Sequence, residues 1–250
     1  MKVLLTGGSG FIGNHLSDFL KMNHKVSMLD ISPPHLKDIE FRKGDITSPA
    51  DVTKAVMGTD VVIHLAAMVG VVNSDSEPIK TLDFNIGGTR NVLEACRIHD
   101  VKKIIFPSSS EVYGEPSKLP IKETDTAMPI TTYGLSKLAA EEYVKSYAKT
   151  YGIKYMIFRL FNIYGIRQST RFVIPEFVHL ALKNKQITIH GDGSQIRAFC
   201  NIKDVLHAFS LVLSNENNEI FNIGNDSEPD RKSTRLNSSH IQKSRMPSSA

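Results

Sequence analysis

Tyr133 and Lys137 are the residues whose types and spacing point most directly to chemistry. Residues four apart on a helix share a face, so a phenol and an ammonium group are expected one turn apart. The ammonium charge, together with the positive charge of the hydride acceptor, is expected to lower the pKa of the phenol towards neutral. A phenolate can then take the proton from a hydroxyl group whose carbon gives up a hydride. Such a pair alone is usually only helix surface, so other motifs must support it.

A glycine-rich turn at the start of the chain gives this support. Residues 6–13 read TGGSGFIG between an apolar strand and a helix, which is the setting of a dinucleotide-binding turn. Gly7 permits the tight turn, Gly10 lets the backbone approach a pyrophosphate, and Gly13 lets the helix pack on the strand. The pyrophosphate would meet free amides at the helix N-terminus. The expected cofactor contacts here are Gly7, Gly10, Phe11, Ile12 and Gly13.

Asp30 indicates which dinucleotide binds. It ends the second predicted strand, where a carboxylate can accept both hydroxyls of the adenosine ribose and repels a 2′-phosphate. NAD is therefore favoured over NADP, although an Asp that only caps the next turn is the alternative. Two later segments that each follow a strand are also expected along the cofactor, the first near the adenine and the second along the middle: Asp45 and Ile46, then Leu65, Ala66 and Ala67.

Short apolar strands alternate with longer amphipathic stretches as far as residue 160. This alternation predicts parallel strands with crossover helices on both faces, which is an α/β fold with a Rossmann-type doubly wound parallel sheet. Strands that are apolar throughout support burial on both sides. The predicted strands are 2–6, 25–30, 60–65, 102–107 and 154–160, and the predicted helices are 11–21, 51–57, 80–99 and 133–151.

After residue 162 the pattern loosens. A helix is predicted at 172–183, a short strand at 186–189, a helix at 204–213 and a last strand at 219–223. We expect these pieces to form a smaller, incomplete C-terminal lobe over the carboxyl ends of the main strands. The expected domains are therefore a dinucleotide-binding domain at 1–162 and a partial substrate lobe at 163–229.

Residues 230–250 are expected to lie outside the fold. They are rich in Ser, Lys and Arg without apolar periodicity, so they cannot bury a face. Residues 230–240 and 244–250 back-translate into the two ends of a common sequencing-library adapter, so we interpret the segment as a non-native, disordered tail. A natural basic tail is the alternative. Its five Lys and Arg residues and one Asp carry the whole formal net charge of +4, so charge predicts neither a nucleic-acid nor a membrane partner.

Other features indicate the compartment. The longest apolar runs have the length of strands, well short of a membrane span. The first strand begins at Lys2, which leaves no room for a secretory signal. Cys96 and Cys200 lie far apart and are interpreted as buried thiols, which fits a reducing cytoplasm. No metal site is predicted.

Several motifs in order make the chain resemble the extended short-chain dehydrogenases/reductases, in the NAD-dependent nucleotide-sugar epimerase/dehydratase family. The resemblance covers residue 1 to about residue 226. Its elements are the glycine turn, HLAA (64–67), NIGGTRN (85–91), SSSEVYG (108–114), YGLSK (133–137), RLFNIYG (159–165) and GDGSQIR (191–197).

The resemblance implies a catalytic set of Ser109, Tyr133 and Lys137. Ser109 follows a strand at its carboxyl end, where such sheets place their sites, and its hydroxyl can align the reacting oxygen with Tyr133. Lys137 can also hydrogen-bond the nicotinamide ribose. Asn85 is expected at the cofactor, and Glu111 is a further catalytic candidate.

The pair Ser110-Glu111 bears on the reaction. The 4,6-dehydratases that the chain resembles carry Asp-Glu here, and elimination of water needs an acid and a base beyond the tyrosine. Ser-Glu also resembles nucleotide-sugar decarboxylases and occurs in some epimerases. We therefore favour 4-epimerisation of a UDP-type sugar through a transient 4-keto intermediate. A decarboxylase or dehydratase is the alternative within the family, and a non-catalytic NAD-binding redox sensor is the alternative from another class.

Four residues are expected to contact the substrate: Ser109, Ser110, Asn162 and Arg197. Asn162 and Arg197 are assigned to the diphosphate, because a guanidinium suits phosphate in geometry and charge. A surface ion pair is the alternative for Arg197. Ile166, in place of the usual Pro, and Ala198, in place of a common Asp, depart from the family pattern.

The resemblance carries two further implications. Family members continue beyond residue 226, so the substrate lobe is expected to be truncated. A homodimer through the helices at 80–99 and 133–151 is also implied.

Overall fold

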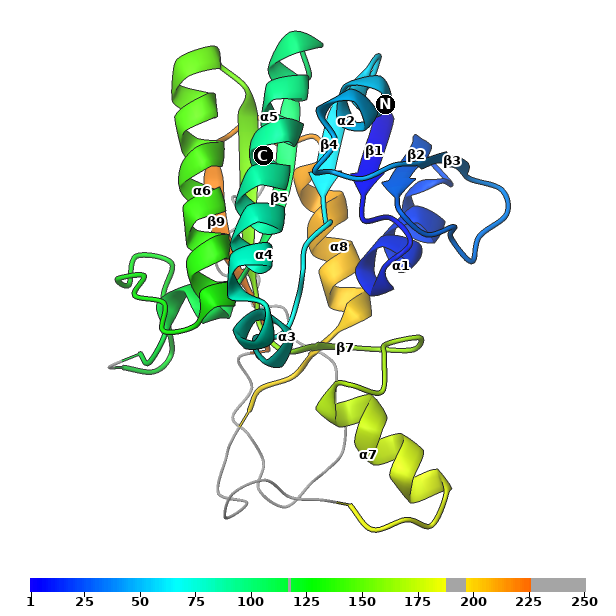
Figure 1. Ribbon diagram of the computed structural model, residues 1–250, viewed down its shortest axis with the longest axis vertical. Coiled ribbons are helices and arrows are strands. Elements are labelled where there is room, and N and C mark those ends of the chain that lie inside the picture. The colour runs from blue at the N-terminus through cyan, green and yellow to red at the C-terminus, as the bar shows by residue number, and fades with distance from the viewer. Residues whose placement is uncertain (117, 188–196, 226–250) are drawn as a thin grey trace, which may run out of the picture.

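A parallel sheet of seven strands forms the centre of the protein, in the order β3-β2-β1-β4-β5-β6-β9 (Figure 1). The structure is a computed structural model that describes residues 1–116, 118–187 and 197–225. The strand order reverses between β1 and β4, which is where open α/β sheets bind ligands. The strands are β1 (Lys2–Thr6), β2 (Lys25–Asp30), β3 (Glu40–Lys43), β4 (Val61–His64), β5 (Lys103–Ser109), β6 (Lys154–Leu160) and β9 (Glu219–Ile223).

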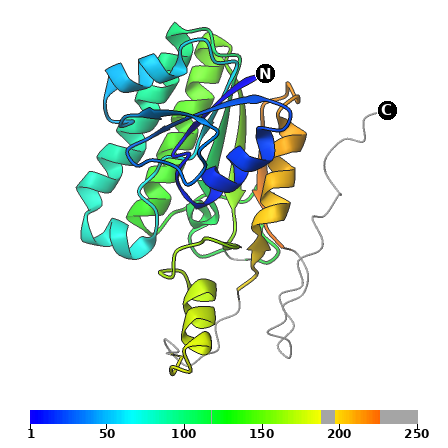
Figure 2. The ribbon, with the colours of Figure 1, turned by 90° about the vertical axis from the view of Figure 1, so that its right-hand side faces the viewer.

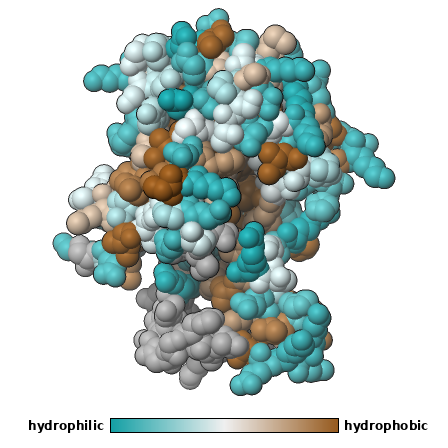
Figure 3. All heavy atoms as spheres, in the orientation of Figure 1, coloured by the Kyte–Doolittle hydropathy of each residue, from teal (hydrophilic) through white to brown (hydrophobic). Residues whose placement is uncertain are grey.

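Helices cover both faces of this sheet (Figure 2). One face carries α1 (Phe11–Leu20) and α8 (Ile202–Val212), which contact each other. The other face carries α2 (Pro49–Val56), α5 (Gly88–Ile98) and α6 (Thr132–Tyr151). On the side of the molecule seen in Figure 3 the surface is mostly hydrophilic, with separate apolar patches.

Two apolar cores result from this layering. Val3 and Leu5 of β1 join the cluster under α1 and α8, whereas Leu4 between them joins the cluster under α2, α5 and α6. The central strands are apolar throughout because both of their faces are buried. The predicted α/β fold of the Rossmann type is confirmed. None of the helices in the described residues is long and apolar enough to cross a membrane.

The helix predicted at 80–99 is formed from Pro78 to Ile98, but it contains a π-helical turn that the sequence pattern does not predict. The segment is divided into α4 (Pro78–Leu82), a π-helical turn η1 (Asp83–Gly87) and α5. Within the π-helical turn, Asn85 is 3% exposed and its side chain is fully engaged by neighbouring segments. A π-helical turn accommodates one extra residue per turn, and such turns occur often at functional sites.

The expectation that residues 163–229 form one lobe needs correction. β9 pairs with β6 and extends the main sheet, and α8 packs beside α1. Both elements join the main layer because their apolar side chains bury there, as Phe209 of α8 does against Phe158 of β6, with ring centroids 5.0 Å apart. Between β6 and α8, the short strands β7 (Ile163–Tyr164) and β8 (Cys200–Asn201) pair with each other and pack on the core under α1 and α8. Among the described residues of this segment, α7 (Val173–Leu182) stands apart, beyond the carboxyl ends of the strands (Figure 1).

Three further differences concern short elements. The patterns do not predict β3 or α3 (Val71–Ser76). The predicted strand at 186–189 is not formed at Gln186 or Ile187, and its remaining residues lie outside the described part of the chain. The predicted tail at 230–250 also lies outside the described residues.

Candidate active site

The glycine turn between β1 and α1 is held against the segment that follows β4. Gly7 has a φ of +69°, and a Cβ there would lie 2.6 Å from the amide nitrogen of Ala66. A Cβ on Gly13 would lie 2.5 Å from the carbonyl oxygen of Gly7. The amide of Gly10 donates to that same carbonyl at 3.1 Å. Side chains are thus excluded from this turn by neighbouring backbone, as expected for a turn that must approach a ligand closely.

Asp30 supports the glycine turn from the end of β2. Its carboxylate accepts hydrogen bonds from the amides of Ser9 and Ser32, each at 3.0 Å. The residue therefore caps local backbone, which is one of the two roles expected of it. A carboxylate has about four lone-pair sites, so acceptor capacity for a ribose remains.

Asp45 and Ile46 differ in their surroundings. The Asp45 carboxylate is partly exposed and accepts from the amide of Thr47 at 2.8 Å. The side chain of Ile46 is 3% exposed and packs in the core, where a Cβ on Gly88 would lie 2.4 Å from its Cδ1 atom. Ile46 could therefore meet a cofactor only through its backbone.

Asn85 fixes the segment after β4 to the helix α6. Its Oδ1 accepts from the amide of Met68 at 2.8 Å, and its Nδ2 donates to the Met68 carbonyl at 3.1 Å and to Ser136 Oγ at 2.9 Å. Both hydrogens of Nδ2 and the Oδ1 atom of Asn85 thus already have hydrogen-bond partners within the protein. Asn85 positions the partly exposed residues Leu65 to Ala67 rather than offering its side chain to a cofactor.

His64 connects the same segments from inside the sheet. Its Nδ1 is 2.6 Å from Thr6 Oγ1, and its Nε2 is 3.0 Å from Thr89 Oγ1. Thr89 must donate its only hydroxyl proton to the Asn85 carbonyl, 2.6 Å away, because a carbonyl cannot donate. Thr89 therefore accepts from His64, which must carry its proton on Nε2. Burial lowers the pKa of His64 to about 3, and the charge of Lys137 acts in the same direction.

Ser109, Tyr133 and Lys137 meet at the carboxyl end of β5. Ser109 is the last residue of β5 and Tyr133 lies in the first turn of α6, where the Thr131 side chain caps the helix. A side-chain hydrogen bond to Ser109 acts on the Tyr133 phenol. Lys137 is 4% exposed, donates to the Pro107 carbonyl at 2.9 Å, and lies 6.0 Å from the centre of the Tyr133 ring. Three of the four catalytic candidates are thus brought together, and the fourth, Glu111, lies close enough for its charge to act on the Tyr133 phenol.

The expected lowering of the phenol pKa is not found in the protein alone. Removal from water raises the pKa of Tyr133, the charge of Glu111 raises it further, and the hydrogen bond to Ser109 opposes both. The Lys137 ammonium, which donates to the Pro107 carbonyl, has no resolved effect on the phenol. Burial lowers the pKa of Lys137 to about 8, and Glu141 opposes that change.

The residues expected at the substrate are only partly brought together. Asn162 has a φ of +34°, and its Nδ2 donates to the carbonyl of Ala198 at 3.0 Å. Because Arg197 directly precedes Ala198, this bond places exposed Arg197 near Asn162, beyond the carboxyl end of β6. Ser110 is partly exposed and begins a short 3-10 turn, η2 (Ser110–Tyr113), directly after Ser109.

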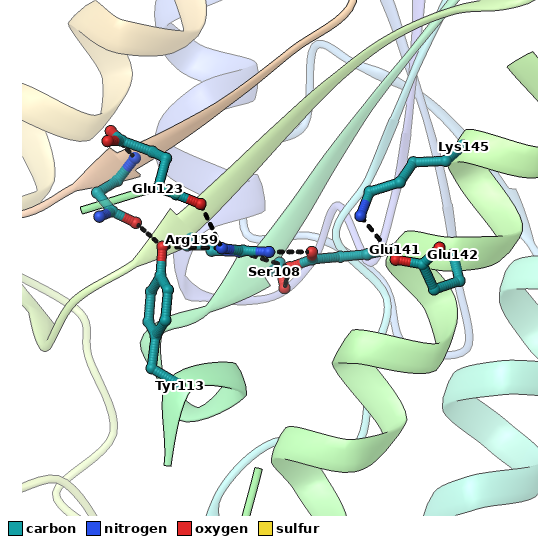
Figure 4. A network of polar contacts seen from close by, with 8 residues as sticks. Ser108, Tyr113, Glu123, Glu141, Glu142, Lys145 and Arg159 are labelled. Carbon is teal, nitrogen blue, oxygen red and sulfur yellow. Dashed lines mark hydrogen bonds and ion pairs between the residues drawn. The ribbon is translucent and has the colours of Figure 1, made fainter. Parts of the chain in front are cut away.

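Sequence reasoning did not assign roles to a buried network behind the site (Figure 4). Glu141 of α6 and Arg159 of β6 form an ion pair at 2.7 Å with side chains 0% and 4% exposed. A signal was present, since Glu141 stands four residues after Lys137 and Arg159 opens one of the family motifs. Periodicity alone cannot show that either charge is buried.

Comparison with known proteins decides the family. A model of the NAD-dependent epimerase/dehydratase family matches residues 3–224. The chain belongs to this family. A Methanocaldococcus jannaschii protein, provisionally named as a UDP-glucose 4-epimerase, is 42% identical over 238 residues, covering 90% of this chain and 77% of that protein.

Two solved structures of family members are similar to the protein. The Thermotoga maritima UDP-glucose 4-epimerase with UDP-glucose has a TM-score of 0.86 and 34% identity, over 90% of this chain and 77% of that one. The Thermus thermophilus UDP-glucose 4-epimerase in complex with NAD has a TM-score of 0.83 and 32% identity, over 90% and 78%. The protein is thus an NAD-dependent epimerase/dehydratase family enzyme.

The residues of this family member fit NAD. Gly10 precedes α1 without a side-chain cap, so no side chain occupies the amides of the first turn, at Phe11 and Ile12. Such amides are where a helix N-terminus binds a pyrophosphate. The crowded glycines of the turn leave no side chain in the way, and Asp30 is positioned at the adjacent strand end.

Replacement of Gly13 by Ala should destabilise the protein and weaken NAD binding. The new Cβ meets backbone oxygens at 2.5 and 2.6 Å that cannot move independently, so we expect a loss of about 1–3 kcal/mol in the free energy of unfolding. Gly87→Ala is the matched control, because Gly87 is helical and has nothing within 4 Å of its Cβ position. It should be neutral or stabilising by up to about 1 kcal/mol. Urea unfolding and NAD titration measure both; equal effects in the two variants would contradict the packing argument.

His64 should remain neutral in the folded protein at pH values where an unfolded histidine is charged. Its pKa falls from 6.5 to about 3 on folding, so only the unfolded chain binds this proton in between. The free energy of unfolding should therefore decrease as the pH falls below 6.5, by up to about 1.4 kcal/mol per pH unit from this group.

Two measurements check this expectation. Imidazole 15N NMR should find His64 neutral, with its proton on Nε2, at pH 5. His64→Gln should flatten the pH dependence of unfolding, whereas His207→Gln, at an exposed position, should leave it unchanged. A His64 signal that titrates near pH 6 would refute the assignment.

Proposed function

We propose that the protein inverts C4 of a UDP-linked sugar through a transient 4-keto intermediate, using tightly held NAD. The observation that carries the proposal is the meeting of Ser109, Tyr133 and Lys137 at the carboxyl end of β5, near the glycine turn. The similar proteins named as UDP-glucose 4-epimerases support the choice of reaction.

Each of the three residues has a distinct task in this proposal. Ser109 orients the C4 hydroxyl of the sugar towards Tyr133, and the Tyr133 phenol oxygen takes the hydroxyl proton and later returns it. Lys137 keeps a positive charge beneath the phenol. NAD supplies the hydride acceptor and, when oxidised, a positive charge that lowers the pKa of the phenol against the effect of burial.

The substrate contacts remain proposals. Arg197 and Asn162 would bind the diphosphate, and Ser110 would contact the sugar. Ser110 also supports epimerisation over dehydration, because a hydroxyl cannot replace the carboxyl group of the Asp that the 4,6-dehydratases carry.

We also propose a homodimer through α5 and α6. Leu135 and Tyr143 of α6 are 50% and 37% exposed, and Ile98 of α5 is 51% exposed, so this helix pair presents apolar side chains that a second copy could cover.

The buried free thiols of Cys96 and Cys200 favour a reducing compartment such as the cytoplasm.

The NAD-loaded protein should convert UDP-galactose, or another UDP-sugar of a broad panel, into its C4 epimer. The product formed in D2O should carry no deuterium at C4, because the hydride returns to the carbon that it left. Release of carbon dioxide or a 4-keto-6-deoxy product would instead assign the decarboxylase or dehydratase activity. NAD binding without any product would favour the redox-sensor alternative.

Tyr133→Phe should reduce kcat by about 10²- to 10⁴-fold, the usual contribution of a general acid–base, with NAD affinity retained. Tyr151→Phe is the control, because Tyr151 ends the same helix and is 52% exposed. Steady-state kinetics and NAD titration separate the two effects. Turnover that survives in Tyr133→Phe would remove the phenol from its proposed role.

A further inference from the structure

Glu141 occupies the position one helical turn beyond Lys137 on the buried side of α6. Its Oε2 accepts from Arg159 Nη2 at 2.7 Å, and its Oε1 accepts from Arg159 Nε at 3.1 Å and from Ser108 Oγ at 2.5 Å (Figure 4). The carboxylate thus joins α6 to β5 through Ser108 and to β6 through Arg159. Ser108 directly precedes Ser109, so these bonds also restrain the end of β5 that carries a catalytic group.

Arg159 continues the network towards the substrate side of the sheet. Its Nη1 donates to Tyr113 Oη at 2.8 Å and to the Glu123 carbonyl at 3.3 Å. Tyr113 in turn donates to Asn222 of β9 at 2.7 Å, and the Asn222 amide donates to Glu123 Oε1 at 2.9 Å. The same ion pair therefore also restrains η2, β9 and the segment around Glu123.

Glu141 also acts through its charge on Lys137, which lies beneath Tyr133. Lys137 is buried, and Glu141 is the group that raises its pKa against burial. The other groups around Lys137 carry no negative charge at neutral pH: the Tyr133 phenol on α6, the Pro107 carbonyl and Phe106 ring on β5, and neutral His64 on β4. Two more charges lie nearby, Glu111 of η2 acting on Tyr133 and Arg159 of β6 bound to Glu141.

We propose that Glu141 is a positioning residue of the active site, whose buried carboxylate fixes α6 on β5 and β6 and keeps Lys137 charged beneath Tyr133. The inference rests on the proposed function of Tyr133 and Lys137. A buried ion pair can often be replaced by apolar residues of similar size without loss of stability. If the pair were only structural, such a replacement would also leave catalysis unchanged. Stability and catalysis can therefore be separated by replacing both partners together.

The decisive variant is the paired replacement Glu141→Leu with Arg159→Met, which leaves neither charge unpaired. Glu141→Gln removes the carboxylate alone. Glu142→Gln is the matched control, because Glu142 is the next residue, is exposed, and pairs with Lys145 at 2.7 Å. Three readouts apply to each variant: thermal unfolding, titration of Lys137 by 13C NMR of labelled lysine, assigned with Lys137→Arg, and the separate values of kcat and KM.

The paired variant should fold, titrate Lys137 at a lower pH than the wild type, and lose about 10- to 100-fold in kcat with little change in KM. Glu142→Gln should match the wild type in all three. A folded paired variant with unchanged Lys137 titration and kcat would overturn the proposal. If the paired variant does not fold, Glu141→Gln gives the same decision. If the wild type turns over no UDP-sugar, the proposed function fails, while the Lys137 titration still decides the role of Glu141.

Discussion

Three charged side chains are almost completely removed from water at one place in this protein, and the need to pair them constrains everything around it. Lys137, Glu141 and Arg159 are 4%, 0% and 4% exposed. A buried charge without a partner costs several kcal/mol, so α6, β5 and β6 must meet in the one register where carboxylate meets guanidinium and ammonium meets the Pro107 carbonyl. The positions of Tyr133 and Lys137, the proposed catalytic side chains on α6, depend on that register.

Behind the site, neutral polar groups are saturated in the same way. His64 uses both ring nitrogens, and Asn85 uses both atoms of its amide group, to join β1, β4, η1 and α6. At the surface of the site, by contrast, no side chain caps the backbone amides in the first turn of α1. Around this site the protein thus satisfies the polar groups of His64 and Asn85 itself and leaves the amides in the first turn of α1 for a ligand.

The sequence predicts the layered part of this fold well because its signals are local. The strand–turn–helix at residues 2–20 follows from apolar runs and glycine spacing, and the Tyr133–Lys137 pair follows from helical geometry. Signals that depend on distant partners were missed: the π-helical turn exists around contacts of Asn85 with Met68 and Ser136, and β9 belongs to the sheet because β6 offers it an edge. The predicted lowering of the Tyr133 pKa included the charge of the bound nicotinamide; in the protein alone desolvation raises this pKa, and residue spacing says nothing of desolvation.

The π-helical turn η1 also limits how this region can change by insertion or deletion. One α-helical residue corresponds to a rotation of about 100° around the axis. Loss of a single residue within Asp83–Gly87 would restore ordinary helical winding and rotate α4 by that angle relative to α5. Asn85 could then no longer bond both Met68 and Ser136, and the segment after β4 would lose this attachment to α6. The extra residue of this turn thus sets the angle at which α4 leaves α5.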